Sequence, residues 1–251
     1  MATIGAVIQA RLSSSRLPGK MTKKLLGVPL ILRAVEQLSY SKNIDRLIVA
    51  TSDETSDDAL EALCIENNIK VYRGSLNDVQ KRFINVADSY GLDAIIRITG
   101  DNPLTDPAMI DDLIDLYLEN PSLDYINNIH ADGAVHGAGC ELVSVSALKR
   151  SYDMLQSEPD PSAFTEHVTF FIRKNTDLFK TKKFYPDESL SRKEISYSVD
   201  FPEDFSLVEI IYKNLYAKDS PFKTREVLTF LDENPELLNI NGHLHDQLPD
   251  Y

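Results

Sequence analysis

A group of basic and hydroxyl side chains lies near the start of the chain, in the stretch QARLSSSRLPGK. Arg11 and Arg16 can bind phosphate oxygens through forked contacts, and Lys20 can act on them as a point charge. The serines add hydroxyl donors, and a Pro-Gly pair turns the chain. The stretch lacks the spacing of a P-loop or of a dinucleotide-binding loop, yet its residue types suit the binding of phosphate groups.

The distribution of charge favours a specific anionic ligand for this stretch. The chain of 251 residues has 39 acidic and 26 basic side chains, and a formal net charge of −13. Six of the basic residues and none of the acidic ones lie in the first 35 positions. The acidic balance argues against broad binding to nucleic acid or to an anionic membrane. A solvated basic loop is the alternative to phosphate binding.

Asp101 and Asp200 each follow an apolar stretch that is typical of a buried strand. Asp106 and Pro107, which lie near Asp101 in the sequence, are explained structurally as the cap and the first residue of a helix. Asp101 itself has no such structural explanation. Asp200 is either a helix cap or a second metal-binding carboxylate. Mg²⁺ takes one or two carboxylates together with substrate phosphates, so the two aspartates could share one such ion.

The other polar residues give weaker indications of a catalytic or metal-binding role. Glu203 and Asp204 are expected to interact with the dipole of a helix that begins beside them. The five histidines show no zinc-binding spacing, and His243 and His245, in a polar tail, are expected to be exposed to solvent. No nucleophile motif occurs, so the sequence gives no support for covalent catalysis.

Alternating strand and helix patterns must position these groups. Apolar, β-branched stretches predict buried strands, at 4–10, 46–52, 70–74, 94–101 and 124–129. Helical spacing follows each of the first four, at 30–38, 56–68, 78–90 and 109–120. This alternation predicts an α/β fold, with a mostly parallel sheet and helices on both of its faces. Ligands bind at the carboxyl ends of such strands, where QARLSSSRLPGK, TSDE and GDNPLTD all fall.

The pattern changes after about residue 130. The glycine-rich stretch 130–139 is expected to be a mobile loop. A strand and a helix are predicted within 140–155, a helix at 163–175, strands at 178–185 and 194–199, and a helix at 202–216. Segment 130–195 is interpreted as a small excursion from the core of a single domain that spans 1–251, and the chain is expected to rejoin the sheet near Tyr197.

The N-terminus and the cysteines suggest a cytoplasmic protein. The first residues lack a basic region and a cleavage site, which favours a buried strand over a signal peptide. No stretch approaches the roughly 18 apolar residues of a membrane helix. Cys64 and Cys140 form no motif, and two thiols in a chain of this length fit a reducing compartment without disulfides.

Several stretches resemble the nucleotide-sugar cytidylyltransferases, which include the acylneuraminate and 3-deoxy-manno-octulosonate cytidylyltransferases. IQARLSSSRLPGK resembles their signature loop, and the closer similarity is to the branch named for spore coat polysaccharide biosynthesis protein F. Similar stretches follow in order and reach about residue 216: LIVATSDETSDDALEALC, VYRGSLNDVQKRF, IRITGDNPLTDP, CELVSVSALKRSY, TEHVTFFIRKN and YSVDFPEDFSLV. HADGAVHGAGCE departs from the acceptor patterns of the family, and GDNP has asparagine where cysteine or glutamate is expected.

The resemblance implies a Rossmann-like sheet, CTP as the donor, Mg²⁺, and a homodimer. Segment 130–195 is implied to take part in acceptor binding and dimerisation. The implied nucleotide-binding residues are Arg11, Ser14 and Lys20 on the phosphates, with Ala10, Thr51 and Arg73 near the base or ribose and Gly100 close behind. Asp101 and Asp200 are implied to hold Mg²⁺, and together with Arg11 and Lys20 they form the expected catalytic group.

The implied reaction is transfer of CMP from CTP to an acidic sugar or sugar-like acceptor, with release of pyrophosphate, for surface polysaccharide synthesis. Such chemistry needs positioning and charge neutralisation rather than a nucleophilic side chain. A glycosyltransferase that binds a finished nucleotide-sugar is one alternative, and it predicts a DxD metal motif that residues 94–106 lack. A catalytically inactive nucleotide-binding domain is another, and it would be favoured by loss of Asp101 or Asp200.

Overall fold

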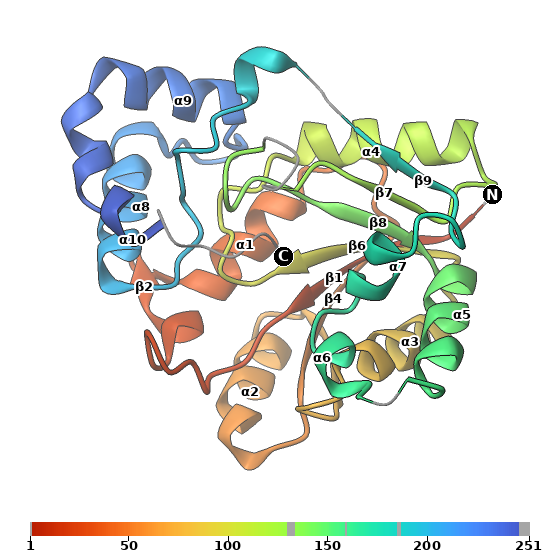
Figure 1. Ribbon diagram of the computed structural model, residues 1–251. Helices are drawn as coiled ribbons and strands as arrows, with labels where there is room; N and C mark the ends of the chain where they lie inside the picture. Colours follow the sequence, from red (N-terminus) through yellow and green to blue (C-terminus); the bar gives the residue numbers. More distant parts are fainter. Residues whose placement is uncertain (1, 130–133, 159, 185–186, 246–251) are drawn as a thin grey trace.

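A central sheet runs through the protein and carries helices on both faces (Figure 1). The computed structural model describes residues 2–129, 134–158, 160–184 and 187–245. Within these residues the strands of the sheet are β1 (Ile4–Gln9), β4 (Arg46–Ser52), β5 (Lys70–Gly74), β6 (Ala94–Thr99), β7 (Tyr125–Asn127), β8 (Glu141–Ser144) and β9 (Thr181–Lys183). Their order is β5-β4-β1-β6-β8-β7-β9, and β8 runs antiparallel to its neighbours β6 and β7. The predicted mostly parallel α/β fold is confirmed.

The helices fall close to the predicted ranges in the first half of the chain. The longer ones are α1 (Leu30–Leu38), α2 (Asp58–Glu66), α3 (Val79–Tyr90), α4 (Pro107–Glu119), α5 (Val145–Leu155), α8 (Pro202–Leu215) and α9 (Thr224–Glu233). Shorter helices are α6 (Ser162–Thr165), α7 (Phe170–Lys174) and α10 (Gly242–His245), and single 3-10 turns are η1 (Lys20–Thr22), η2 (Thr55–Asp57), η4 (Glu188–Leu190) and η5 (Pro235–Asn239). A short hairpin of β2 (Lys24–Leu25) and β3 (Val28–Pro29) follows the first loop.

The central strands are buried on both faces, which explains their continuous apolar sequences. Ala6 and Ile8 of β1 pack in a cluster with α1, α2 and α4, whereas Val7 between them packs with α3, α5 and α7 on the opposite face. Successive side chains of a strand point to opposite faces, so a strand covered on both sides needs an apolar residue at every position. The helices thereby hold the carboxyl ends of β1, β4, β5 and β6 in one row.

A third apolar cluster joins the end of the chain to its beginning. Leu17 and Leu25 from the N-terminal loop and hairpin pack with Leu207 of α8 and Leu228 of α9. Figure 1 shows α8, α9 and α10 together at one end of the molecule, beside the β2 region. The residues after 216, for which the sequence indicated no role, therefore belong to this part of the core.

Two predictions for the second half of the chain are wrong. Residues 194–199 form no strand of the sheet, because the place beside β6 is taken by β8, which lies within the supposed excursion. The chain near Tyr197 instead lies against the segment that contains His136, and Tyr197 N–H donates to His136 O at 3.0 Å. The predicted helix 163–175 is broken into α6 and α7, and the break brings the Thr169 hydroxyl to Glu141 Oε1 at 2.6 Å.

Other expectations concern the cysteines, the membrane and the glycine-rich loop. Cys64 and Cys140 are free thiols, and both are buried. Among the described residues, no helix is long and apolar enough to cross a membrane. Residues 130–133, with which the predicted mobile loop begins, lie outside the described residues.

Candidate functional site

The loop after β1 turns back on itself and brings Lys20 to the end of the sheet. The buried side chain of Leu17 anchors the loop in the third apolar cluster. Ser14 Oγ accepts a hydrogen bond from Leu17 N–H at 3.3 Å, and Gly19 N–H donates to Leu12 O at 3.2 Å. Gly19 has φ of 67°, a left-handed conformation that costs a glycine little. Lys20 follows directly at the start of η1.

Lys20 joins the two aspartates that the sequence singled out. Its Nζ lies 2.6 Å from Asp101 Oδ2 and 2.9 Å from Asp200 Oδ1, and it donates a third bond to Val199 O at 2.9 Å. The Lys20 side chain is only 7% exposed. Val199 N–H donates to Asp101 O at 2.9 Å, so the segments that carry the two aspartates are also tied through their backbones. Asp101 and Asp200 thus meet at one cationic centre, which is the Lys20 ammonium group.

The charges of this centre stabilise one another. Burial alone would lower the pKa of Lys20, but the nearby charges of Asp101 and Asp200 outweigh it and raise this pKa above its ordinary value. Burial alone would raise the pKa of Asp101, and the Lys20 charge and hydrogen bond instead hold it below its ordinary value. The ammonium and the Asp101 carboxylate therefore stay charged at neutral pH.

Arg16 and Arg11 lie further out on the same loop. Arg16 Nη2 is 2.8 Å from Asp200 Oδ1, and its guanidinium lies 5.2 Å from the centre of the Phe201 ring. Arg11 Nη2 is 3.9 Å from Glu166 Oε1, which is too long for a direct hydrogen bond. Both arginine side chains are about half exposed, at 48% and 49%. Both guanidinium groups are open to solvent on one side, and their predicted binding of phosphate stays a prediction.

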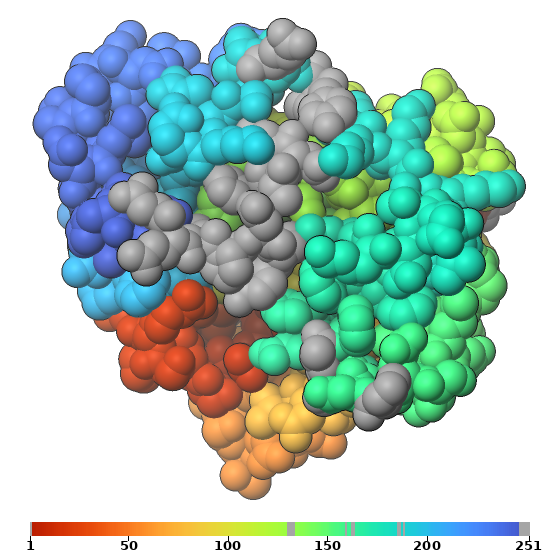
Figure 2. Space-filling view, in the orientation of Figure 1, coloured from red at the N-terminus to blue at the C-terminus, as the bar shows by residue number. Residues whose placement is uncertain are grey.

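The first loop faces the segment around α6 across the surface. Figure 2 shows the N-terminal residues, in red, beside the green-blue segment that contains α6 and α7. The ion pair of Arg11 with Glu166 crosses between these two segments. Burial lowers the pKa of the neighbouring His167 below its ordinary value, so this imidazole is neutral at physiological pH.

Gly100 and Ala10 pack against each other beside Met21 and α1. A Cβ atom on Gly100 would lie 2.9 Å from Ile31 Cδ1, 3.0 Å from Met21 Sδ and 3.1 Å from Ala10 Cβ. Ala10 is itself 2% exposed. The missing side chain of Gly100 therefore makes room for Met21, the residue next to Lys20, and for α1. The predicted place of Ala10 and Gly100 near the nucleotide stays a prediction.

Asp57 is a site residue that the sequence did not reveal. It is fully buried and accepts hydrogen bonds from Leu12 N–H at 2.8 Å, from the Thr51 hydroxyl at 2.9 Å, and from both the backbone and the hydroxyl of Ser52. Burial alone would raise its pKa, but these donors together lower it. Asp57 thus fastens the base of the first loop to the end of β4. In the sequence it looks like any acid in the first turn of a helix.

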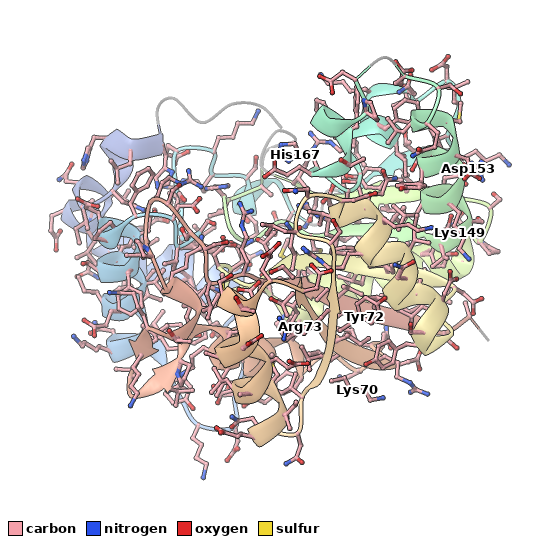
Figure 3. All side chains as sticks on the ribbon, turned by 90° about the horizontal axis from the view of Figure 1, so that it is seen from below. Lys70, Tyr72, Arg73, Lys149, Asp153 and His167 are labelled. Carbon is pink, nitrogen blue, oxygen red and sulfur yellow. The ribbon has the colours of Figure 1, made fainter. Side chains whose placement is uncertain are left out.

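Arg73 is bound to α2 and does not join the Lys20 centre. It lies beside Thr51 at the end of β5, as expected. Its Nη1 lies 2.7 Å from both Asp58 Oδ1 and Glu61 Oε2, and it also donates to the carbonyls of Ser52 and Glu54. Figure 3 shows Arg73 against this helix, apart from His167. Its predicted place near the base or ribose stays a prediction.

A second polar centre lies on the face of the sheet covered by α5 and α7. Glu141 is 3% exposed and is contacted by Arg97 Nη1 at 2.6 Å, by the Thr169 hydroxyl at 2.6 Å and by the Tyr125 hydroxyl. Burial alone would raise the pKa of Glu141, and the Arg97 charge and these hydrogen bonds lower it. Arg97 remains 20% exposed and reaches Gln9 Oε1 at 3.4 Å. The sequence analysis did not identify this centre, and its one visible sign in the sequence is a glutamate inside the apolar pattern CELVS.

The residues at the Lys20 centre fit a magnesium ion. Two carboxylates already converge on one positive charge, and their oxygens are the hard ligands that Mg²⁺ takes together with phosphate oxygens and water. Among the described residues, no group of three or more His, Cys, Asp or Glu side chains could hold a metal by itself. The site therefore suits an ion that arrives with a phosphate ligand.

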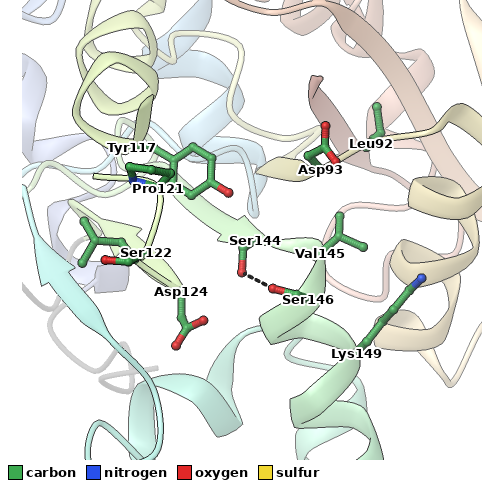
Figure 4. A pocket seen from close by; sticks show the side chains of 11 residues that line it. Leu92, Asp93, Tyr117, Pro121, Ser122, Asp124, Ser144, Val145, Ser146 and Lys149 are labelled. Atoms are coloured by element: carbon green, nitrogen blue, oxygen red, sulfur yellow. Dashed lines mark hydrogen bonds between the residues drawn. The ribbon is translucent and has the colours of Figure 1, made fainter. Parts of the chain in front are cut away.

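A cavity lies at the opposite ends of the strands from the Lys20 centre. It has a volume of about 580 Å³ and is lined by Asp93 before β6, by Ser144 at the end of β8 and by the first residues of α5 (Figure 4). The hydroxyls of Ser144 and Ser146 share a hydrogen bond of 3.2 Å within it. Because β8 is antiparallel, this cavity faces the amino ends of the parallel strands. It is separate from the Lys20 centre.

The chain resembles known proteins along most of its length. Residues 5–227 match the family model of cytidylyltransferases. The chain is 33% identical over 236 residues to spore coat polysaccharide biosynthesis protein SpsF of Bacillus subtilis. The matched residues cover 92% of this chain and 94% of that protein. The matched region contains Lys20, Asp101 and Asp200.

Solved structures share the fold. A cytidylyltransferase from Leptospira borgpetersenii superposes with a TM-score of 0.87 at 27% identity and covers 99% of both chains. A CMP:2-keto-3-deoxy-manno-octonic acid synthetase solved in complex with CTP has a TM-score of 0.63 at 18% identity and covers 85% of this chain and 100% of its own. Their similarity supports the predicted Rossmann-like nucleotidyltransferase sheet.

Proposed function

The chain belongs to the cytidylyltransferase family, and from this premise we propose that it transfers CMP from CTP to an acidic sugar or sugar-like acceptor. Pyrophosphate is the second product. The proposed use is the synthesis of a surface polysaccharide, since the Bacillus subtilis relative carries polysaccharide biosynthesis in its name. We also propose that Mg²⁺ takes part and that the enzyme is a homodimer to which segment 130–195 contributes.

One observation carries this proposal. The Lys20 ammonium group contacts both Asp101 and Asp200, and the loop that leads to Lys20 carries two half-exposed arginines. The carboxylates can bind a metal ion, and the loop can bind the phosphates that the ion neutralises. A single site thus offers both signs of charge that a metal-bound nucleoside triphosphate requires.

In the proposed reaction, an acceptor oxygen attacks the α-phosphorus of CTP. A bond forms between this oxygen and phosphorus, and the bond from the α-phosphorus to the bridging oxygen breaks. Pyrophosphate leaves with the bridging oxygen, and the proton of the acceptor hydroxyl is released to solvent. Arg11 and Arg16 hold the triphosphate, and Lys20 keeps a positive charge beside it. Asp101 and Asp200 would hold Mg²⁺, which would neutralise phosphate charge when bound. The protein thus contributes position and electrostatics.

We place the acceptor between the first loop and the segment of α6 and α7. Arg97 is the cation that supports this placement, because its guanidinium is partly exposed next to Gln9. Glu141 holds the other side of this guanidinium, and the Thr169 hydroxyl in turn donates to Glu141. A carboxylate on the acceptor could pair with the exposed side of Arg97. This suits an acidic sugar better than a neutral one.

The test is release of pyrophosphate. The full chain is incubated with Mg²⁺ and each of the four nucleoside triphosphates, across a panel of keto-sugar acids and sugar phosphates. We expect release with CTP and an acidic acceptor. Lys20→Ala and Asp101→Asn should each reduce the rate by at least about 100-fold, because each removes charge at the reacting phosphates.

Lys24→Ala is the matched control, because Lys24 is an exposed lysine of the same basic segment. Its rate should equal that of the unmodified protein. Absence of pyrophosphate release with CTP over the whole panel would reject the proposed function. Normal rates in Lys20→Ala or Asp101→Asn would reject the site. Turnover of a finished nucleotide-sugar without pyrophosphate would favour the glycosyltransferase alternative.

A further inference from the structure

A fully buried carboxylate lies behind Asp200. Asp204, near the start of α8, accepts hydrogen bonds on Oδ2 from the backbone N–H groups of Asp200 at 2.9 Å and Phe201 at 2.8 Å. Its other oxygen, Oδ1, is contacted by Asn241 Nδ2 at 2.8 Å and by His245 Nε2 at 2.8 Å. Burial alone would raise the pKa of Asp204, and these four donors together lower it.

Both donors to Oδ1 come from the C-terminal segment 241–245, which lies beyond the residues that match the family model. Figure 1 shows α10 next to α8. The hydrophobic side chains of η5, which precede this segment, pack on the third apolar cluster and so anchor it. The prediction that His245 is exposed is wrong, since its side chain is only 8% exposed, whereas His243 of the same turn is exposed as expected.

An ordinary helix cap would not need these tail residues. A capping carboxylate binds the N–H groups at a helix start and leaves its second oxygen to water. Here Asn241 and His245 replace that water, and Asn241 also donates to Ser196 O at 2.9 Å, on the chain that leads to Asp200. Because an acceptor-only carboxylate faces it, His245 Nε2 carries the hydrogen.

The hydrogen bonds of Asp204 also affect the candidate metal site. Asp204 holds the backbone N–H of Asp200, and Asp200 Oδ1 in turn contacts Lys20 at 2.9 Å and Arg16 at 2.8 Å. Without its tail donors, the buried charge of Asp204 would lose half of its hydrogen bonds. It would then move toward other donors or water, and the backbone of Asp200 would move with it.

We propose that Asn241 and His245 are positioning residues, which fix the metal-binding carboxylate of Asp200 through Asp204. The C-terminal segment thus sets the metal affinity of the active site. This inference rests on the proposed function, because it takes Asp200 as a metal ligand.

The experiment measures metal binding directly. Mn²⁺ serves as the probe in the presence of CTP, and electron paramagnetic resonance of free Mn²⁺ gives its Kd for the full chain. His245→Ala and Asn241→Ala should each raise this Kd by about tenfold, since residues that orient a metal ligand commonly change affinity by about 10- to 100-fold. The Kd of metal-free CTP, measured by calorimetry, should stay unchanged, which a general loss of structure would not allow.

Two further variants test whether the hydrogen bond of His245 is responsible for the change in metal affinity. His245→Gln places an amide nitrogen near the position of Nε2 and should restore binding to within about twofold, because the hydrogen bond is kept. His243→Ala changes an exposed histidine of the same helix and should have no effect. Equal losses in His245→Ala and His245→Gln, or in His243→Ala, would overturn the hydrogen-bond assignment.

Asp200→Asn separates this inference from the proposed function. We expect it to weaken Mn²⁺ binding more than either tail variant. If Asp200→Asn weakens binding and the tail variants do not, the positioning role is wrong while the metal assignment stands. If Asp200→Asn leaves the Kd unchanged, the metal assignment itself fails, and the positioning proposal fails with it.

Discussion

The ammonium group of Lys20 links two carboxylates that lie 81 and 180 positions away in the chain. Taking such charges out of water is costly, and the cost is offset only while each keeps its partner. Lys20 is therefore a structural residue as well as a proposed phosphate contact.

At the scale of single residues, Asp57 offers the sharpest test of loop positioning. Asp57→Ala removes the acceptor for Leu12 N–H and leaves the hydroxyls of Thr51 and Ser52 buried without it. We expect a loss of about 3 kcal/mol in the free energy of unfolding, since each unsatisfied buried group costs about 1–3 kcal/mol. Urea denaturation measures this loss.

The same variant should bind CTP more weakly, because the base of the loop that is proposed to bind phosphate is no longer fastened to β4. Calorimetry at a temperature where the variant is folded measures the CTP affinity. Asp53→Ala, which changes an exposed acid of the same connection, is the matched control. Unchanged CTP affinity in Asp57→Ala would show that the loop holds its shape without this carboxylate.

At the scale of elements, the loops that follow β1 and β6 are fixed by partners from distant helices. Asp106 is a clear case. Its Oδ1 accepts from Ala108 N–H at 3.0 Å as the cap of α4, and its Oδ2 accepts from Thr224 N–H at 2.8 Å at the start of α9. One carboxylate thus caps one helix and attaches a second.

Asp106→Ala should therefore cost more than loss of a cap alone. A lost cap typically costs about 0.5–2 kcal/mol, and the orphaned Thr224 N–H adds about 1–3 kcal/mol, so we expect about 3 kcal/mol from chemical denaturation. Asp106→Asn keeps one oxygen acceptor and should lose less. A loss below about 0.5 kcal/mol in Asp106→Ala would mean that water replaces both bonds.

At the scale of the whole molecule, buried carboxylates join the parts of the core. Asp57 ties the first loop to β4, Glu141 lies within the sheet, and Asp204 joins α8 to the C-terminal segment. Each is at most 3% exposed, and the pKa of each is lowered in the folded protein. Their charges must all be kept for the whole fold to be stable.

This arrangement predicts loss of stability in acid. Because these pKa values are lower in the folded protein than in the unfolded chain, the unfolded chain binds more protons as the pH falls. The stabilisation is complete above the ordinary carboxyl pKa of about 4 and is lost below it, as the pH falls through the folded values. With three such groups the free energy of unfolding should fall by up to about 4 kcal/mol per pH unit.

Denaturation curves between pH 6 and the lowest pH that retains the fold would measure this slope. Asp57→Asn is the matched variant, since it removes one titrating group and should reduce the slope by about 1.4 kcal/mol per pH unit. A stability that does not change below pH 4 would contradict the assignment of these carboxylates as charged and buried.

The sequence by itself determined the alternation of strands and helices, the basic loop and the two aspartates at strand ends. These are local signals: apolar residues at every strand position, helical spacing, and a charged side chain directly after an apolar run. The cap at Asp106 was also predictable, because a capping residue and the proline after it adjoin in the chain. Family membership follows from the same stretches.

Only the tertiary structure decided which elements and side chains meet. The place beside β6 belongs to β8 and not to residues 194–199, although both have apolar, strand-like sequences. The partners of Lys20, Asp57 and His245 lie up to 180 positions away, and no local pattern specifies them. A buried polar group needs a partner wherever the folded chain brings one, so these contacts become visible only when the distant segments are packed together.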